Sequence, residues 1–259
     1  MQASADLSRR CDEHARRDAE RSRETVDVGP FRALLDRTTD LIWLNYAVPV
    51  APLGQDESVA AALDELRRVF SARGRALRFE FNALPWPDLP RALERAGLRL
   101  HAEHPLMVCT PESFSPIASH GVGVGMLDDR SPEADLRAYL TILGLAFGDS
   151  PALVTDADIA ELRGKLAGGL HLRALATLDG APAGAATLSP IDDIAELAGV
   201  ATHPDARRRG VAATASSFLT REHFDRGGRV AWLSAADAIA QAVYRKVGFQ
   251  LIDTRLNYM

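Results

Sequence analysis

The chain is poor in cysteine, and it lacks long apolar runs. Cys11 and Cys109 are the only cysteines among 259 residues, one in a charged stretch and the other in an apolar one. This pattern argues against a disulfide framework and fits a reducing compartment. No apolar run approaches the roughly 18–20 residues of a membrane span, and the charged N-terminus has no apolar signal-peptide core. We therefore expect a cytoplasmic protein with no membrane partner.

Lysine is also scarce, and several catalytic motifs are missing. Lys165 and Lys246 are the only lysines, the net charge is −5 and the pI is about 5.8. A nucleic-acid-binding domain would be basic, so we expect no nucleic-acid partner. No His, Cys or Asp cluster has metal-ligand spacing, and neither a Gly-x-Ser-x-Gly elbow nor a credible Cys/His pair is present. The sequence therefore predicts no metal site and no covalent acyl-enzyme.

What is present is a globular composition, with 47% hydrophobic and 25% charged residues, which suits one large or two ordinary domains. The stretch 110–121 (TPESFSPIASHG) contains two prolines and several serines, as is typical of a linker. Arginines and acids alternate before it at residues 1–24, which favours a solvated helix or a frayed tail. We therefore divide the chain into a polar tail at 1–24, a domain at 25–115 and a domain at 116–259.

Hydrophobic periodicity predicts alternating strands and helices in both domains. In the first domain we expect strands at 41–50, 76–82 and 98–109 and helices at 58–73 and 87–96. In the second we expect strands at 122–127, 171–178, 183–188, 194–202, 229–233 and 248–258, and helices at 132–147, 156–167, 210–224 and 237–246. Asp179-Gly180 is a strong turn signal for a hairpin between two of these strands.

Residues 196–213 (ELAGVATHPDARRRGVAA) lead from a strand through a turn into the start of a helix. A helix N-terminus presents unpaired N–H groups and a partial positive charge, so it can hold an anion without a metal. The glycine would let a phosphate approach the backbone. The stretch therefore predicts a pyrophosphate site, held mainly by backbone N–H groups. The residues expected to form it are Arg207, Arg208, Arg209, Gly210, Val211, Ala212 and Ala213.

Two segments of the second half together resemble one known family. Residues 207–212 (RRRGVA) match an Arg/Gln-x-x-Gly-x-Gly/Ala signature, with Ala212 in place of the second glycine. Residues 237–249 (DAIAQAVYRKVGF) resemble a closing Asn-x-x-Ala-x-x-Leu-Tyr-x-x-x-Gly-Phe block, with Asp237 where asparagine is common. Both signatures belong to the GNAT superfamily of acyl-CoA-dependent N-acyltransferases. The resemblance covers about residues 120–259.

This resemblance implies acetyl-CoA as the co-substrate and assigns further residues to it. The pantetheine arm of coenzyme A would pair with a strand edge at Val200, Ala201 and Thr202, and Asp237 would lie close to that arm. The resemblance also implies that Tyr244 protonates the leaving thiolate. Tyrosine, with a reference pKa of about 10, suits such an acid role. A tyrosine that serves only for packing is the alternative.

Glu196 is the candidate base. It is the only acid within residues 195–202, and it lies eleven positions before Arg207. The resemblance places it at the catalytic glutamate of the histone-acetylating branch, where it would take a proton from the acceptor ammonium. Binding the acceptor and a structural ion pair are the alternatives. Lesser candidates for the base are His203, Asp192 and Asp193.

The first half follows the same element order as the end of the second, with Gly97 aligned to Gly248. No Arg-x-x-Gly-x-Gly/Ala lies between Val50 and Ala61. We interpret residues 25–115 as a degenerate GNAT-like domain without a cofactor loop, with an unrelated α/β domain as the alternative. The expected fold class is α/β (α+β), with two tandem GNAT-like units, each a mixed, mostly antiparallel sheet flanked by helices.

The resulting prediction is an N-acetyltransferase whose catalytic domain is residues 116–259. It would move acetyl from acetyl-CoA to a primary amine by direct attack in a ternary complex. The acceptor would be a small molecule or a protein or peptide amine, and a homodimer is compatible with this function. The alternative is a non-catalytic acyl-CoA-binding or interaction module, which would not need Tyr244 and Glu196.

Overall fold

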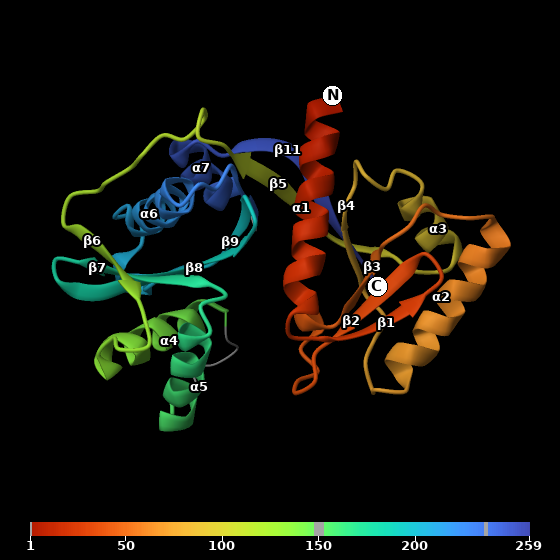
Figure 1. Cartoon of the computed structure of the whole chain (residues 1–259), viewed down its shortest axis with the longest axis horizontal. Helices are drawn as coiled ribbons and strands as arrows, with labels where there is room; N and C mark the ends of the chain where they lie inside the picture. Colours follow the sequence, from red (N-terminus) through yellow and green to blue (C-terminus); the bar gives the residue numbers. More distant parts are fainter. Residues whose placement is uncertain (1, 148–152, 236–237) are drawn as a thin grey trace. The chain divides into compact units, whose positions relative to one another are not determined.

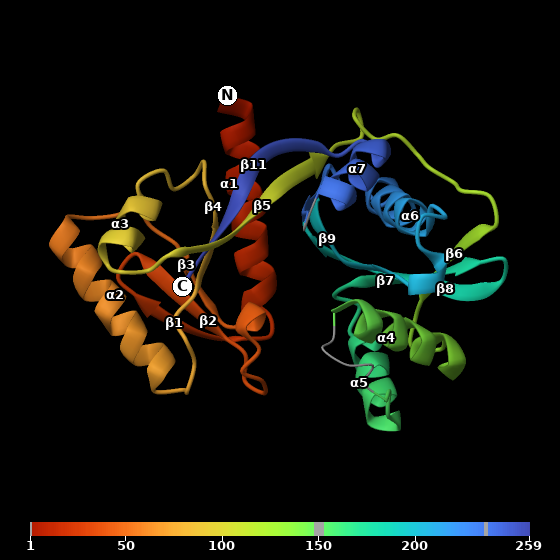
Figure 2. The ribbon, with the colours of Figure 1, turned by 180° about the vertical axis from the view of Figure 1, so that it is seen from behind.

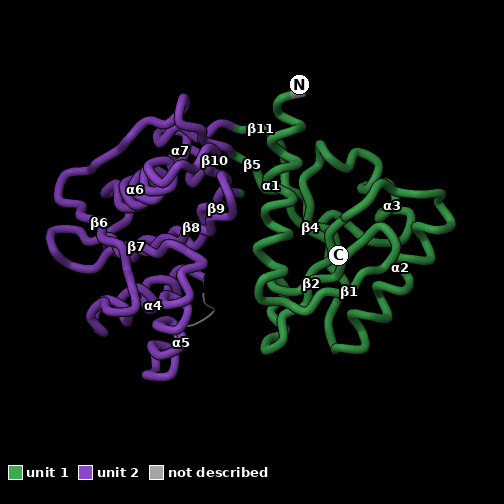
Figure 3. The backbone as a smooth tube through the Cα atoms, viewed as in Figure 1, with its two compact units in different colours: residues 1–107, 234–236, 251–259 green, residues 108–233, 237–250 purple. Residues whose placement is uncertain are grey.

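The computed structural model describes residues 2–147, 153–235 and 238–259, which fold into two compact units (Figure 3). Unit 1 comprises residues 1–107, 234–236 and 251–259, and unit 2 comprises residues 108–233 and 237–250. Each unit is a mixed, mostly antiparallel sheet flanked by helices (Figure 1), which confirms the predicted fold class. None of the described helices is long and apolar enough to span a bilayer.

Unit 1 has the strand order β1-β2-β3-β4-β11-β5, in which β3 and β4 are parallel. Its elements are α1 (Gln2–Glu20), β1 (Glu24–Val28), β2 (Phe31–Leu35), η1 (Ile42–Leu44), β3 (Tyr46–Pro49), α2 (Asp56–Ser71), β4 (Phe79–Asn82), α3 (Leu89–Arg95), β5 (Leu100–Cys109) and β11 (Gln250–Tyr258). On β2, Phe31, Ala33 and Leu35 pack with residues of α2 and α3, whereas Leu34 packs with Ala19 of α1. Alternate residues of one strand thus serve two cores.

The β1–β2 hairpin was not predicted, and the expected strand 41–50 is shorter than its composition indicates. Only residues 46–49 are strand, because 42–44 form a 3-10 turn. Asn45 holds that turn: its Nδ2 donates to the carbonyl of Leu41 over 2.8 Å, and its Oδ1 accepts from the Asp36 amide over 2.9 Å. A side chain that bonds to nearby backbone in this way competes with strand pairing.

Residues 1–24 differ from the expected solvated helix or frayed tail. Residues 2–20 of this stretch form α1, which buries one face that includes Ser8, Cys11 and His14. Several of its contacts are polar: the main-chain carbonyl of Ser8 accepts from Asn82 Nδ2 over 2.9 Å, and the Asp12 carboxylate accepts from Trp86 Nε1 over 2.8 Å. Cys11, Ala15 and Ala19 on the buried face are spaced four residues apart, but these small side chains give only a weak apolar signal among charged neighbours.

The last strand also differs from its expected place at the end of the second half. Residues 251–259 belong to unit 1, where β11 pairs antiparallel with β4, in the register Arg255↔Asn82 to Tyr258↔Phe79. Arg255 Nε donates to Glu80 over 2.7 Å and lies 3.5 Å from Asp12. The chain therefore passes from unit 1 to unit 2 after residue 107 and returns to unit 1 after residue 250, and residues 234–236 also belong to unit 1. The sequence predicted a single boundary at residue 115.

Unit 2 has the strand order β10-β9-β8-β7-β6, with β9 and β10 parallel. Its elements are β6 (Val122–Leu127), α4 (Glu133–Phe147), α5 (Asp156–Ala167), β7 (Leu172–Leu178), β8 (Ala181–Ile191), β9 (Ile194–Thr202), η2 (Pro204–Ala206), α6 (Val211–Asp225), β10 (Val230–Ser234) and α7 (Ala238–Val247). These bounds confirm the predicted elements of the second half up to α7, and those of β6, α5 and β9 agree to the residue.

Helices cover both faces of the unit 2 sheet. Figures 1 and 2 show α4 and α5 on one face and α6 on the other. Ala185 of β8 belongs to the core with α4 and α5. A Cβ added at the neighbouring Gly184 would meet Val211 of α6 at 2.5 Å. Odd-numbered β8 residues near this point therefore face α4 and α5, and even-numbered ones face α6.

The segment predicted to be a linker is an ordered part of unit 2 that packs along α6. The amide of Ile117 donates to Ser217 Oγ over 2.8 Å, and the amide of Ser119 donates to Thr214 Oγ1 over 3.1 Å. The Phe114 and Phe224 rings pack edge to face, with centroids 5.5 Å apart. The buried hydroxyls of α6 thus serve as acceptors for irregular backbone.

Candidate active site

The N-terminus of α6 forms the predicted anion site. Gly210 is its N-cap residue, with φ +83°, and no side chain caps the helix end. The N–H groups of the first helical turn, which starts at Val211, have no acceptor within the helix. Arg208, two residues before the cap, is also left-handed, with φ +62°. The turn therefore bends sharply and leaves an uncapped positive helix end that an anion could occupy.

Gly210 is required there for a reason that the sequence did not show. Its φ lies in the left-handed region, and an added Cβ would meet Ser119 Oγ at 2.1 Å. The glycine thus allows the 113–121 segment to approach the helix end. Substitution of Gly210 would disturb this packing as well as any bound phosphate, so it is a poor test of anion binding.

The three arginines are exposed, and they are secondary to the backbone. Arg209 lies 3.5 Å from Asp179, with both side chains more than half exposed. Ion pairs of this kind contribute about 0–1 kcal/mol. The arginines raise the local positive potential, but the directional donors at this site are the N–H groups of α6.

β9 carries a bulge beside this helix end. Ala198 pairs with Thr187 and Ala201 pairs with Ala185, so two residues of β9, Gly199 and Val200, stand opposite the single Ala186. Gly199 has φ +57°. In the described part of the chain the β9–β10 register ends at the Glu196–Trp232 pair. The edge of β9 from residue 197 onward, which includes Val200, Ala201 and Thr202, is therefore paired on its β8 side only, as an added extended ligand would require.

Glu196 stands where the pairing of β9 with β10 stops. It is partly buried, and it lies opposite Ser189 of β8 and Trp232 of β10. Directly opposed residues of antiparallel strands share a face, so Glu196 and Ala198 lie on the same face as Thr187. That face is the one covered by α4 and α5, because Tyr139 of α4 bonds to Thr187 over 2.6 Å. The candidate base therefore faces the α4–α5 side of the sheet.

Tyr244 lies on α7 and is partly buried, with its ring 6.0 Å from that of Phe249 at an angle of 64°. Helix α6 contacts both β9 and α7. The helix that provides the anion site thus also packs against the strand of Glu196 and the helix of Tyr244. Asp237, the remaining predicted contact of the pantetheine arm, lies outside the described residues.

Comparison with known proteins shows which protein family this site resembles. Residues 138–249 match the model of the acetyltransferase (GNAT) family. Over these residues the C-terminal half of this chain is similar to the GNAT family. Its match covers the anion site, the bulged strand and the helix of Tyr244, so the resemblance carried by the two sequence segments is confirmed.

Solved structures extend the GNAT likeness over the whole chain. A GCN5-related N-acetyltransferase from Kribbella flavida is 26% identical, with a TM-score of 0.81 over 97% of this chain and 95% of that one. A GCN5-related N-acetyltransferase from Sphaerobacter thermophilus is 17% identical, with a TM-score of 0.67 over 88% and 76%. A tandem GNAT protein from the clavulanic acid biosynthesis pathway is 14% identical, with a TM-score of 0.61 over 88% and 77%. A comparison with curated proteins found no match. Unit 1 is therefore GNAT-like in fold, as predicted.

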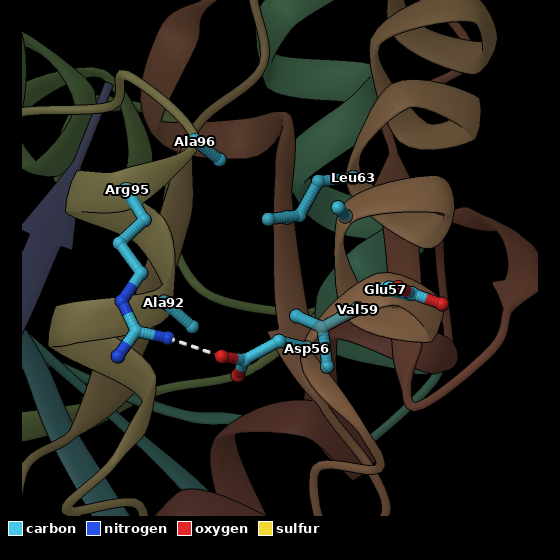
Figure 4. A pocket seen from close by; sticks show the side chains of 8 residues that line it. Asp56, Glu57, Val59, Leu63, Ala92, Arg95 and Ala96 are labelled. Carbon is cyan, nitrogen blue, oxygen red and sulfur yellow. Dashed lines mark hydrogen bonds and ion pairs between the residues drawn. The ribbon is translucent and has the colours of Figure 1, made fainter.

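In unit 1, the helix that corresponds to α6 in element order has a different N-terminus. Helix α2 begins with Asp56 and Glu57, which place negative charge where α6 presents only N–H groups. Figure 4 shows these acids at a groove between α2 and α3, with Arg95 of α3 bonded to Asp56. Acids in the first turn stabilise the helix but repel a phosphate. The N-terminus of α2 thus differs from that of α6 in charge as well as in loop sequence.

Two of the lesser candidates lie in turns, and Asp193 is engaged through its main-chain carbonyl. His203 Nδ1 accepts from the Asp205 amide over 3.4 Å and caps η2. Asp192 has φ +53° in the β8–β9 turn, where aspartate is tolerated. The carbonyl of Asp193 accepts from the amides of Arg229 and Val230. Burial raises the pKa of Cys109 to about 11, so this thiol stays protonated and is a weak nucleophile.

Sequence reasoning missed a polar group on the α4–α5 face. Arg173 of β7 pairs with Thr187 of β8, and Thr187 bonds to Tyr139. Burial raises the pKa of Tyr139, although Thr187 and Arg173 oppose the shift. Arg173 is the only charged residue in its strand. Glu196 became a candidate base for the same kind of reason, as the only acid within residues 195–202. Among the described residues no group of three or more His, Cys, Asp or Glu side chains could hold a metal.

Proposed function

We propose that unit 2 is an N-acetyltransferase that moves acetyl from acetyl-CoA to the amine of a small molecule or a peptide. The observation that carries the proposal is the uncapped N-terminus of α6 beside the bulged, one-sided edge of β9. The helix end suits a pyrophosphate, and the strand edge suits the pantetheine amides. Acetyl-CoA, when bound, supplies the thioester.

The chain's own residues would then manage two protons. Glu196 takes a proton from the acceptor ammonium, directly or through a water. The neutral nitrogen attacks the thioester carbonyl, the C–N bond forms and the C–S bond breaks. Tyr244 donates its hydroxyl proton to the leaving thiolate. The second proton, which the nitrogen loses as it becomes an amide, restores the Tyr244 hydroxyl, and Glu196 releases its proton to solvent. No residue is acylated in this scheme, which agrees with the raised pKa of the Cys109 thiol.

Replacing Glu196 by glutamine is expected to lower kcat/KM on the order of 10²-fold, because a general base typically contributes about that much. Gln cannot accept the proton at any pH, so the fall of kcat/KM toward low pH should disappear. Asp193→Asn, at a lesser candidate for the base, should stay within about twofold because Glu196 takes the proton in this proposal. Initial rates from pH 5 to 9 measure both variants. Full turnover by Glu196→Gln at every pH would exclude this role.

Replacing Tyr244 by phenylalanine is expected to slow thiol release on the order of 10²-fold, since the acid is lost while the ring remains to contact Phe249. Release of coenzyme A is followed with a thiol reagent across a panel of primary amines. Calorimetric titration with acetyl-CoA runs in parallel. Binding without amine-dependent release in the native protein would contradict the transferase and leave a binding module.

A further inference from the structure

A pocket of about 340 Å³ lies between α4 and α5 on the sheet face that also holds Glu196. Its lining includes Tyr139 of α4, Lys165 of α5, Arg173 of β7 and Thr187 of β8. Small-molecule sites are commonly cavities of roughly 300 Å³ or more with a few polar groups among apolar ones. The size of this pocket suits a ligand of the dimensions of an amino acid.

Arg173 is the unusual member of this lining. It is only 8% exposed, and its Nη1 atom is buried without a hydrogen-bond partner among the described residues. Its Nη2 atom lies 3.4 Å from His171 Nδ1. A buried guanidinium without a counter-charge is costly to the folded protein. Such a cost is typical of functional groups that receive their partner from a ligand.

The acids of the pocket are already engaged. Glu161 forms an ion pair with Lys165. Asp158 accepts from the amide and the hydroxyl of Thr155, in the capping box of α5. No ion pair of Arg173 with a described acid is present. The guanidinium is therefore the one strong cation of this pocket whose charge is not compensated within the described part of the chain.

The sheet register relates Arg173 to Glu196. Arg173 pairs with Thr187, and Thr187 pairs with Ala198, two residues from Glu196 on the same face. Two interstrand spacings and two residues along a strand place the Cα atoms of Arg173 and Glu196 about 12 Å apart. Both residues lie on this face of the sheet, where side chains stand roughly perpendicular to the strands. A small molecule on this face could reach both residues, with an anion at one end and an amine at the other.

We propose that this pocket binds the carboxylate of the acceptor, so that the substrates are small amino acids or related amino-carboxylates. The guanidinium fork of Arg173 would hold the carboxylate, and Tyr139 and Thr187 would lie beside it. Nη1 is covered in this conformation, so binding requires a small rotation of the guanidinium. This inference rests on the proposed transferase function, because it places the acceptor amine toward Glu196.

A carboxylate fits the pocket better than a phosphate does. Arginine binds both in a bidentate manner. The lining, however, offers only one uncompensated positive charge, and it also contains Asp158 and Glu161. A phosphate monoester carries nearly two negative charges at neutral pH and would be repelled by these acids. A single negative charge is balanced by Arg173 alone.

The test compares each amino acid with its carboxamide and with the amine that lacks the carboxyl group. The native protein should favour the amino acid by at least tenfold in kcat/KM. Arg173→Met should remove this preference, mainly through a higher KM for the amino acid. Arg173→Lys should restore part of the preference. Arg163→Met on α5, which does not line the pocket, is the matched control and should behave as the native protein.

Each outcome separates this inference from the proposed function. Amine-dependent thiol release without preference for carboxylates would overturn the carboxylate site and leave the transferase standing. Binding of acetyl-CoA without release for any amine would overturn the transferase. The Tm of Arg173→Met should equal or exceed the native value, because removal of an unpaired buried charge is not destabilising. A large fall in Tm would instead identify Arg173 as a structural residue.

Discussion

Replacing Ala212 by glutamate is expected to abolish measurable acetyl-CoA binding. Ala212 is partly exposed in the first turn of α6, two residues after the left-handed Gly210. A carboxylate at this position would stand beside the pyrophosphate in the proposed complex. Like charges a few ångströms apart at an effective dielectric near 20 repel by about 4 kcal/mol. The Kd measured by calorimetry should therefore rise at least 100-fold.

The neutral variant Ala212→Gln is the matched control, because it adds nearly the same volume without the charge. It should weaken binding by no more than about tenfold. Glutamate near a helix N-terminus stabilises the helix, so the Tm of Ala212→Glu should not fall. Loss of acetyl-CoA binding with an unchanged Tm would show that the added negative charge repels the pyrophosphate at the anion site of α6. Equal affinity of Ala212→Glu and the native protein would show that the pyrophosphate does not lie there.

The second half was predictable because its signals are local. Asp179-Gly180 occupies left-handed conformations at φ +52° and +85°, as a tight hairpin turn requires. The step from β9 into α6 is marked by glycine and small residues within a few positions of the helix start. Its bulge was not predictable, because it depends on the register with β8.

The fold of unit 1 was harder to predict because its contacts join distant parts of the sequence. Ser8 of α1 bonds to Asp253, 245 residues away, and Arg255 of β11 bonds to Glu80. Neither leaves a periodic pattern in its own segment. The exchange of β11 into unit 1 is likewise a matter of pairing partners rather than of strand propensity.

The residues of the candidate site also fall into two groups, those that local sequence signals predict and those whose role depends on distant contacts. The anion site and Glu196 were found because each is unusual within its own stretch of sequence. Arg173 is equally unusual in its strand, but its meaning appears only when Thr187 and the pocket between α4 and α5 are placed beside it. A buried charge in a strand is thus a signal for a site, and the three-dimensional neighbours decide which site.

Replacing Arg255 by leucine is expected to destabilise the protein by about 3–5 kcal/mol, the usual cost of leaving buried partners unpaired. Arg255 is 3% exposed and bonds to Glu80 and Asn82, with Asp12 at 3.5 Å. Burial alone would raise the pKa of Glu80, but Arg255 and Arg78 outweigh it and hold that pKa below its usual range. Burial raises the pKa of Asp12 despite Arg255. Thermal unfolding should show a fall in Tm of about 10 °C.

The loss of stability in Arg255→Leu should depend on pH, because the carboxylates of Glu80 and Asp12 stay buried after the arginine is removed. A lowered pKa means that the pairing of Glu80 adds stability above the usual glutamate range, and that this contribution disappears as the pH falls through the folded-state value. Without Arg255, Glu80 keeps only its pair with Arg78 and Asp12 loses the cation beside it, so the burial of both carboxylates favours proton uptake more strongly. The difference in Tm between the two proteins should therefore be larger at pH 7 than at pH 4.5. Arg95→Leu, which breaks the exposed pair with Asp56, should cost less than about 1 kcal/mol at either pH. Equal losses for the two variants would mean that the buried ion cluster does not hold α1, β4 and β11 together.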